Sequence, residues 1–252
     1  MDRVVTGVRS GLRKGLAGTA CKAVLMDLDG TLVLSEDVHR RAWQAFFDAW
    51  AVKITEAEYE QHYMGRRPAD VITGVPGPWT GTDSVAALAT MTAFTLDHAD
   101  SVQVVPGATE LIRQLRTKYL LSVVTSAGAQ WARRILENVL DVRGLVDVVV
   151  TSEDITCGKP SPEGYLRACA ALRVRPEQCL AFEDSPSGVR SLVAAGVRDI
   201  VGVTTTATAA DLTHAGARWT VADLTPRSMQ HIRGSISTRT GAPASSDTEA
   251  EA

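Results

Sequence analysis

The sequence has little of what marks several common protein classes. Aromatic residues make up only 5% of its 252 residues. No apolar run approaches the roughly 20 residues that a membrane-spanning helix needs, so we expect no membrane partner. The four cysteines show no CxxC pair or other metal-binding spacing, and we expect reduced thiols in a cytoplasmic protein. Basic residues are not in excess, and a net charge of -3 argues against nucleic acid as the main partner.

What the sequence does contain is an alternation of strand and helix patterns. Five apolar runs are predicted to be buried strands, namely Ala23–Met26, Leu120–Val124, Val146–Val150, Cys179–Phe182 and Ile200–Val203. Helical patterns lie between the later four, at 129–140, 162–172 and 187–195. Such alternation implies a parallel sheet with helices on both faces. The sequence therefore predicts an α/β protein with a Rossmann-like core of three layers.

A helical segment interrupts this alternation after the first strand. The segment is predicted to contain two helices with no convincing strand between them, and the later of the two covers 82–99. A turn at 106–107 then leads back to the core, before a helix over 108–117. The first helix of the segment is indicated by an apolar stripe at helical spacing, formed by His39, Trp43, Phe47 and Trp50.

The predicted organisation therefore has four parts. Residues 1–20 are basic and rich in glycine, and are expected to form a flexible arm. The α/β core comprises 21–36 and 105–233, and an all-helical cap domain comprises 37–104. Residues 234–252 are rich in Ser, Thr, Ala and Glu, with almost nothing to bury, and are expected to be a disordered tail.

Acidic residues follow two of the predicted strands. Asp27 and Asp29 begin where the first strand ends, and Glu183 and Asp184 follow the strand Cys179–Phe182. An Asp-Gly pair after a strand is also common in ordinary turns. However, strand ends of a parallel sheet line one crevice, where four carboxylates would repel one another. A divalent cation with oxygen ligands resolves that conflict, and the sequence predicts that this cation is Mg²⁺.

Two further residues could bind a phosphoryl group. Ser126 closes the strand that begins at Leu120, and Lys159 lies in the turn Gly158-Lys159-Pro160-Ser161-Pro162. Each alone has an ordinary structural explanation, as a strand-end cap or as a solvated loop residue. Beside the carboxylates, however, a hydroxyl donor and a cation are what a transferring phosphoryl group requires.

Together these segments resemble the motifs of the haloacid dehalogenase superfamily of aspartyl phosphotransferases. Its four motifs occur in order, as Asp27-Leu-Asp29-Gly-Thr31, Thr125-Ser126, Gly158-Lys159-Pro160 and Glu183-Asp184-Ser-Pro-Ser-Gly188. The helical insert resembles the cap of the subgroup that contains sugar-phosphate phosphatases, glycerol phosphate phosphatases and β-phosphoglucomutase.

The resemblance implies a role for each motif residue. Asp27 would attack phosphorus and form an aspartyl-phosphate, whereas Asp29 would protonate the leaving oxygen and then activate water. The phosphoryl oxygens would be held by Ser126, Ala127 and Lys159. The ligands of Mg²⁺ would be Asp27, the backbone carbonyl of Asp29, and Asp184, with Glu183 in support.

The cap is expected to select the substrate. Arg66 and Arg67 could bind sugar hydroxyls or a second phosphate, or could lie in a solvated turn before a helix that starts at Pro68. His39 also has two interpretations. It could simply end the apolar stripe, or it could correspond to a similar His-x-x-Ala-Trp segment in β-phosphoglucomutases.

The predicted function is an Mg²⁺-dependent phosphatase of a small phosphate ester, such as a sugar or polyol phosphate, acting as a monomer or weak dimer. The alternative is a β-phosphoglucomutase-like mutase. Against it, the Ser-Lys-Asn group of such mutases is replaced here by Gly128, Ala129 and Gln130, and the predicted helix 82–99 contains no lysine. A protein that only binds a phosphometabolite is disfavoured because all the expected catalytic side chains are present.

Overall fold

The computed structural model describes residues 21–230 except 65, 67, 82–83 and 143. The predicted arm over 1–20 and the predicted tail over 234–252 lie outside this range. Within the described part of the chain, no helix is both long and apolar enough to cross a membrane.

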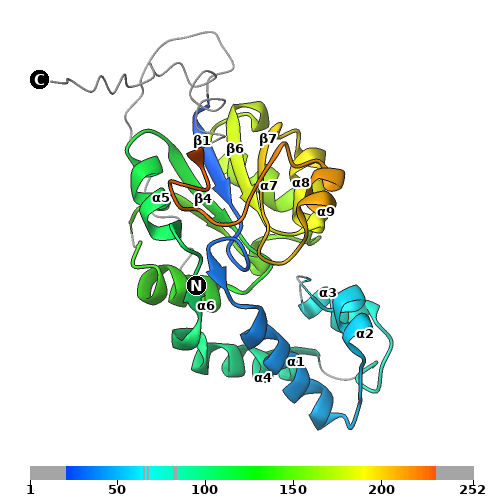
Figure 1. Cartoon of the computed structure of the whole chain (residues 1–252). Coiled ribbons are helices and arrows are strands. Elements are labelled where there is room, and N and C mark those ends of the chain that lie inside the picture. Colours follow the sequence, from blue (N-terminus) through cyan, green and yellow to red (C-terminus); the bar gives the residue numbers. More distant parts are fainter. Residues whose placement is uncertain (1–20, 65, 67, 82–83, 143, 231–252) are drawn as a thin grey trace, which may run out of the picture.

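Six parallel strands form the central sheet, in the order β5-β4-β1-β6-β7-β8 (Figure 1). They are β1 (Ala23–Met26), β4 (Leu120–Val124), β5 (Val148–Val150), β6 (Cys179–Glu183), β7 (Asp199–Val203) and β8 (Trp219–Val221). The middle strand β1 is buried at every position, as its unbroken apolar sequence predicts. Because Met26 is in register with Phe182 of β6, the acidic residues that follow these two positions emerge side by side.

Helices cover both faces of the sheet and confirm the predicted three layers (Figure 1). One face carries α5 (Ala108–Arg116) and α6 (Ala129–Arg134), and the other carries α7 (Glu163–Leu172), α8 (Pro186–Ala195) and α9 (Ala209–Ala215). Alternate residues of β1 pack into two different apolar clusters. Val24 and Met26 join the cluster on the α5 and α6 side, whereas Ala23 and Leu25 join the cluster on the opposite side.

A two-stranded antiparallel ribbon connects the core to the helical insert. It pairs β2 (Val33–Leu34) with β3 (Gln103–Val104). The insert contains α1 (Glu36–Ala49), α2 (Glu56–His62), α3 (Pro68–Gly74) and α4 (Ser84–Asp97). Figure 1 shows these helices at the end of the core toward which β1 runs.

The insert has an apolar cluster of its own. Although aromatic residues make up only 5% of the chain, six of them lie in this cluster, namely Trp43, Phe46, Phe47, Tyr59, Tyr63 and Trp79. The predicted stripe therefore holds at Trp43 and Phe47, and Trp50 packs against the cluster. His39 differs, because its side chain contacts Asp29 of the core.

Several predicted elements have different bounds in the structure, most of them by one or two residues. The strand expected over 146–150 is limited to Val148–Val150. The helix expected over 129–140 is α-helical only as far as Arg134 and continues as a π-helix over Ile135–Val139. Such π segments are rare and usually occur within or beside α-helices.

Candidate active site

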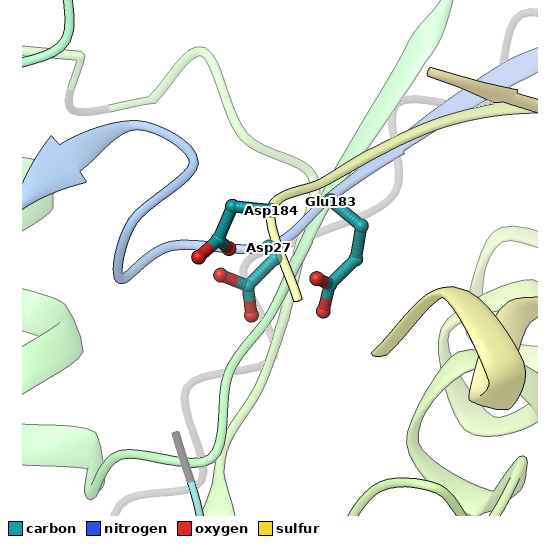
Figure 2. Close-up of side chains that lie close together, drawn as sticks. All are labelled: Asp27, Glu183 and Asp184. Atoms are coloured by element: carbon teal, nitrogen blue, oxygen red, sulfur yellow. The ribbon is translucent and has the colours of Figure 1, made fainter. Parts of the chain in front are cut away.

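Three carboxylates meet where β1 and β6 end. Asp27 follows β1, Glu183 is the last residue of β6, and Asp184 comes next. One oxygen from each carboxylate lies within 4.8 Å of the others (Figure 2). None of the three residues is more than 5% exposed. The parallel pairing of the two strands thus concentrates negative charge in a place where water cannot screen it.

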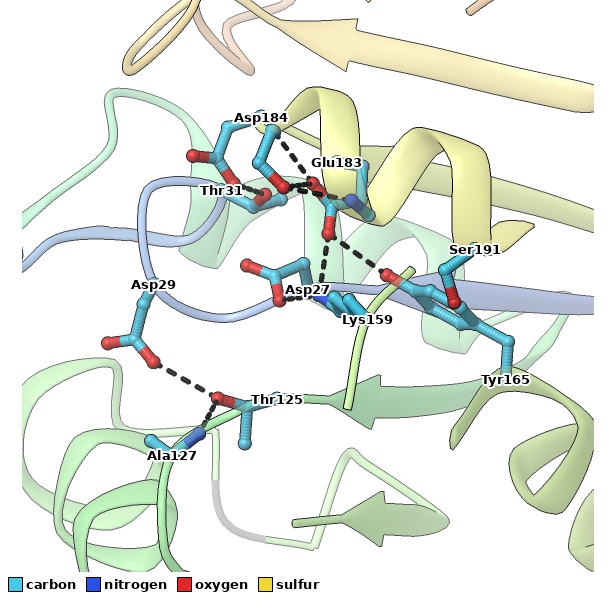
Figure 3. A network of polar contacts seen from close by, with 12 residues as sticks. Asp27, Asp29, Thr31, Thr125, Ala127, Lys159, Tyr165, Glu183, Asp184 and Ser191 are labelled. Atoms are coloured by element: carbon cyan, nitrogen blue, oxygen red, sulfur yellow. Dashed lines mark hydrogen bonds and ion pairs between the residues drawn. The ribbon is translucent and has the colours of Figure 1, made fainter. Parts of the chain in front are cut away.

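Lys159 supplies a positive charge between these carboxylates. Its Nζ contacts Asp27 Oδ1 and lies 2.5 Å from Glu183 Oε1 (Figure 3). Burial alone would lower the pKa of Lys159, but Asp27 and Glu183 hold that pKa well above its usual value. The hydroxyl of Tyr165, on α7, donates to the same oxygen of Glu183 at 3.3 Å. Lys159 is therefore a charged, buried ammonium group.

One ammonium group does not neutralise the cluster. Burial raises the pKa of Asp27 well above its usual range, Lys159 opposes this, and Glu183 and Asp184 raise it further. Burial, and then the charge of Glu183, raise the pKa of Asp184 to about 7. Hard carboxylate oxygens that carry uncompensated charge are the ligands that divalent cations such as Mg²⁺ and Ca²⁺ prefer. The donor set therefore fits a divalent cation.

Asp184 is fixed by two threonines. Thr31 Oγ1 donates to Asp184 Oδ1 at 2.9 Å, and Thr206 Oγ1 donates to Oδ2. The close approach of the first loop requires Gly30, which has a φ of +89°. A Cβ atom on Gly30 would lie 2.1 Å from Asp184 Oδ2, so a side chain at this position would displace the carboxylate.

Glu183 is fixed by the start of α8. Its Oε2 accepts hydrogen bonds from the backbone N–H of Ser185 at 2.7 Å and from the Ser185 hydroxyl at 3.0 Å. Gly188 leaves the space for this carboxylate, because a Cβ atom there would lie 1.6 Å from Glu183 Oε1. In the fourth motif, Ser185 thus holds the Glu183 carboxylate and Gly188 leaves the space for it.

Asp29 has the opposite surroundings, since hydrogen-bond donors encircle it. Oδ1 accepts from Ser35 Oγ at 2.7 Å and from Trp131 Nε1 at 2.8 Å, and lies 3.1 Å from His39 Nε2. Oδ2 accepts from Thr125 Oγ1 at 3.0 Å (Figure 3). Burial alone would raise the pKa of Asp29, but the bonds from His39, Ser35 and Trp131 outweigh burial and hold that pKa below its usual value.

The two residues predicted to hold phosphoryl oxygens from the second and third motifs share one pocket. Ser126 and Lys159 line it together with Thr125 and Tyr165. Ala127, the remaining predicted phosphate-binding residue, lies next to this pocket, and its N–H donates to Thr125 Oγ1 at 3.0 Å. The hydroxyl of Thr125 therefore connects the second motif to Asp29.

The three cap residues of the prediction have different positions. His39, at the start of α1, is brought to the site by its contact with Asp29, and its ring lies edge-on to Trp131 with centroids 5.0 Å apart. This contact adds to the position of His39 at the end of the apolar stripe, and both interpretations of its role stay predictions. Arg66 is exposed, and its guanidinium donates to the His62 carbonyl at 3.3 Å. Arg67 lies outside the described residues.

Several residues of this network were not among the predicted site residues, although some lie inside the quoted motifs. Thr31 and Thr125 are motif residues. The Thr31 hydroxyl donates to Asp184, and the Thr125 hydroxyl donates to Asp29. Trp131 lies in a predicted helix, and the signal was its indole N–H, because a buried tryptophan usually requires an acceptor. Ser35 carried no signal beyond its residue type.

Comparisons with known proteins agree with this geometry. The family model described as haloacid dehalogenase-like hydrolase matches residues 21–196. The chain is 35% identical over 213 residues to validoxylamine A 7'-phosphate phosphatase from Streptomyces hygroscopicus subsp. limoneus, covering 84% of this chain and 98% of that protein. It is 32% identical over 238 residues to a β-phosphoglucomutase from Mycobacterium bovis, covering 81% and 90%. Among solved structures, a hydrolase from Pseudomonas syringae has the same fold, with a TM-score of 0.73 and 20% identity over 85% of this chain and 99% of that one.

Proposed function

This chain belongs to the haloacid dehalogenase-like hydrolase family, and we propose that it is a cytoplasmic, Mg²⁺-dependent phosphatase with Asp27 as its nucleophile. The observation that carries the proposal is the contrast between two aspartates that lie two residues apart. Asp27 faces Lys159 and two further carboxylates, whereas Asp29 is held by donors. Lys159 beside Asp27 favours the ionised carboxylate that a nucleophile must be.

The chain's own residues account for both halves of the hydrolysis. The Asp27 carboxylate forms a bond to phosphorus while the bond to the alcohol oxygen breaks, and Asp29 gives that oxygen a proton. Asp29 then takes a proton from the water that displaces the Asp27 carboxylate. Lys159 and the Ser126 hydroxyl bind the phosphoryl oxygens, and the backbone of Ala127 is a candidate for a further contact with these oxygens.

Asp27, Asp184 and the backbone carbonyl of Asp29 would hold Mg²⁺, with Glu183 in support. When bound, the ion would supply positive charge to the phosphoryl oxygens. The fit rests on the buried carboxylates of Asp27, Glu183 and Asp184, whose charge a single lysine leaves uncompensated.

The proposed substrate is a small phosphorylated metabolite of the sugar or polyol type. The similarity to a phosphatase of validoxylamine A 7'-phosphate and to a 2-deoxyglucose-6-phosphate phosphatase from Saccharomyces cerevisiae supports this class. His39 contacts Asp29, the proposed proton donor to the leaving group. Arg66 and Arg67 stay candidates for contacts between the cap and the substrate.

A phosphosugar mutase is the second candidate, and His39 favours it. The contact of His39 with Asp29 brings a titratable cap residue to the proposed acid, and a β-phosphoglucomutase is among the relatives. Against this candidate, a mutase must hold a bisphosphate at both ends, which requires a second cationic site. The α4 helix contains no lysine, and Gly128, Ala129 and Gln130 carry no charge.

The test of the proposed function is phosphate release from p-nitrophenyl phosphate. We expect turnover with Mg²⁺, loss of turnover with excess chelator, and recovery when Mg²⁺ is returned. Asp27→Asn should abolish turnover while circular dichroism stays unchanged, because the amide is isosteric with the carboxylate but is not a nucleophile. Substantial activity of Asp27→Asn, or full activity in chelator, would refute the assignment.

Phosphorus NMR separates phosphatase from mutase. The enzyme is given β-glucose 1-phosphate with a trace of the 1,6-bisphosphate, and the products are followed with time. A phosphatase accumulates inorganic phosphate. Accumulation of glucose 6-phosphate without inorganic phosphate would instead establish the mutase.

A further inference from the structure

Asp29 receives a hydrogen bond from a tryptophan that lies in the core. Trp131 is in the first turn of α6, is only 3% exposed, and packs in the apolar cluster on that face of the sheet. Its indole Nε1 lies 2.8 Å from Asp29 Oδ1, a normal length for a strong hydrogen bond to a carboxylate. Burial on all sides fixes the direction in which the N–H group points.

The two oxygens of Asp29 have partners of different kinds. An indole N–H can only donate, so the oxygen that it faces must act as an acceptor. Ser35 Oγ also donates to that same oxygen, Oδ1, at 2.7 Å, and His39 Nε2 lies 3.1 Å from it, so Oδ1 is the more crowded of the two oxygens. The partner of Oδ2 is the hydroxyl of Thr125, which donates to it at 3.0 Å in the structure but, unlike an indole N–H, can also turn to accept a proton from it. A proton on the Asp29 carboxyl therefore belongs on Oδ2.

We propose that Trp131 is a positioning residue for proton transfer by Asp29, because its indole N–H reserves Oδ1 as an acceptor and leaves Oδ2 as the oxygen that carries the proton. This inference rests on the proposed phosphatase function. As Asp27 bonds to phosphorus, the electron pair of the breaking bond goes to the alcohol oxygen, which takes the proton from Oδ2. The water that releases phosphate from Asp27 returns a proton to Oδ2, so each turnover restores the starting state.

The kinetic test compares two substrates of nearly equal shape. p-Nitrophenyl phosphate releases a stable phenolate that needs little proton donation, whereas 4-nitrobenzyl phosphate releases a strongly basic alkoxide. In Trp131→Phe, kcat/KM for the benzyl ester is expected to fall about 10–100-fold, part of the 10²–10⁴-fold that general acid catalysis typically contributes. For the phenyl ester we expect a fall of no more than about 3-fold, because proton donation contributes little there. Asp29→Asn should shift the ratio of the two constants in the same direction.

Two further variants separate positioning from packing. Trp79 is also 3% exposed, and its indole N–H donates to the Val75 carbonyl at 3.1 Å within the cap. Trp79→Phe should therefore leave the ratio of the two kcat/KM values unchanged. Ser35→Ala removes a second donor to Oδ1 without altering Trp131, and should shift the ratio in the same direction as Trp131→Phe. An equal loss for both substrates in Trp131→Phe and in Ser35→Ala would overturn the inference.

The contact itself can be measured without turnover. The chain has five tryptophans, so a ¹⁵N-labelled sample gives at most five indole N–H signals. The signal that disappears in Trp131→Phe should be the signal that moves most in Asp29→Asn, while the Trp79 signal stays in place. An unmoved Trp131 signal would overturn the inference. A wild-type protein that cleaves neither ester would refute the proposed function, and the indole signal would still decide whether Trp131 binds Asp29.

Discussion

Replacing Lys159 by methionine should cost the fold much more stability than the loss of an ordinary charge. The Lys159 side chain is 9% exposed and contacts Asp27 and Glu183, whose side chains are 7% and 0% exposed. Methionine retains an unbranched apolar stem but carries no charge. Lys159→Met therefore leaves three carboxylates buried within one small volume without an opposing cation.

The expected loss follows from that burial. Removing one partner of a buried, charged pair typically destabilises a protein by about 3–5 kcal/mol, because the remaining charge is neither solvated nor paired. For a chain of this size, each kcal/mol lowers the melting midpoint by about 2–4 °C. The midpoint of Lys159→Met in excess chelator should therefore lie about 6–20 °C below that of the wild type.

Mg²⁺ should reduce this deficit, because the ion compensates the same carboxylates. A ligand present at 100 times its dissociation constant adds about 2.7 kcal/mol to the stability of the state that binds it, and the variant, whose carboxylates lack the lysine, should bind the ion more tightly and gain more than the wild type at the same concentration. The assay is thermal and urea unfolding followed by circular dichroism, with chelator and with saturating Mg²⁺. The matched control is Arg167→Met, which removes a cation from an exposed pair with Glu163 and should shift the midpoint far less. If Lys159→Met unfolds in chelator at the wild-type midpoint, the electrostatic account of the cluster is refuted.

Two further predictions concern residues that support the site. The backbone N–H groups of Cys157 and Thr156 donate to Glu163 and lower its pKa from 4.5 to about 2, so its stabilising effect is present above pH 4.5 and is lost as the pH falls through about 2. Glu163→Gln should accordingly have a lower urea midpoint at neutral pH, and the gap to wild type should close between pH 4.5 and about 2; a constant gap would contradict this. Thr206→Val removes a donor from Asp184 and should raise the Mg²⁺ concentration for half-maximal activity about 10–100-fold, with the saturated rate unchanged. An unchanged Mg²⁺ requirement would contradict that role of Thr206.

The core elements could be predicted from sequence because each is continuous and apolar on both faces. Ala23–Met26 and Leu120–Val124 have the bounds that their apolar runs predict. Trp219–Val221 was missed because three residues form no pattern that separates a strand from a loop. The ribbon of Val33–Leu34 and Gln103–Val104 is shorter still, and its two halves are joined only by pairing across the whole insert.

The site could be predicted as a set of residue types but not as a network of contacts. Strand ends and motif spacing were enough to bring together Asp27, Lys159, Glu183 and Asp184. The surroundings of Asp29 were not predictable, because its partners come from the residue after β2, from α1, from the residue after β4 and from α6. Which side of those helices meets a strand end depends on how the cap packs on the core, and no local periodicity encodes that packing.

The first motif shows how local chemistry and tertiary contacts combine at each position. Leu28 is completely buried, and this anchors the loop between the two aspartates. The anchor places Asp27 against Lys159 and lets Asp29 reach the donors of the cap and of α6. Gly30 then turns with a positive φ, which brings the Thr31 hydroxyl onto Asp184. The residues of the motif are thus required by contacts with several other elements, and for this reason the spacing identifies the site although the sequence does not show those contacts.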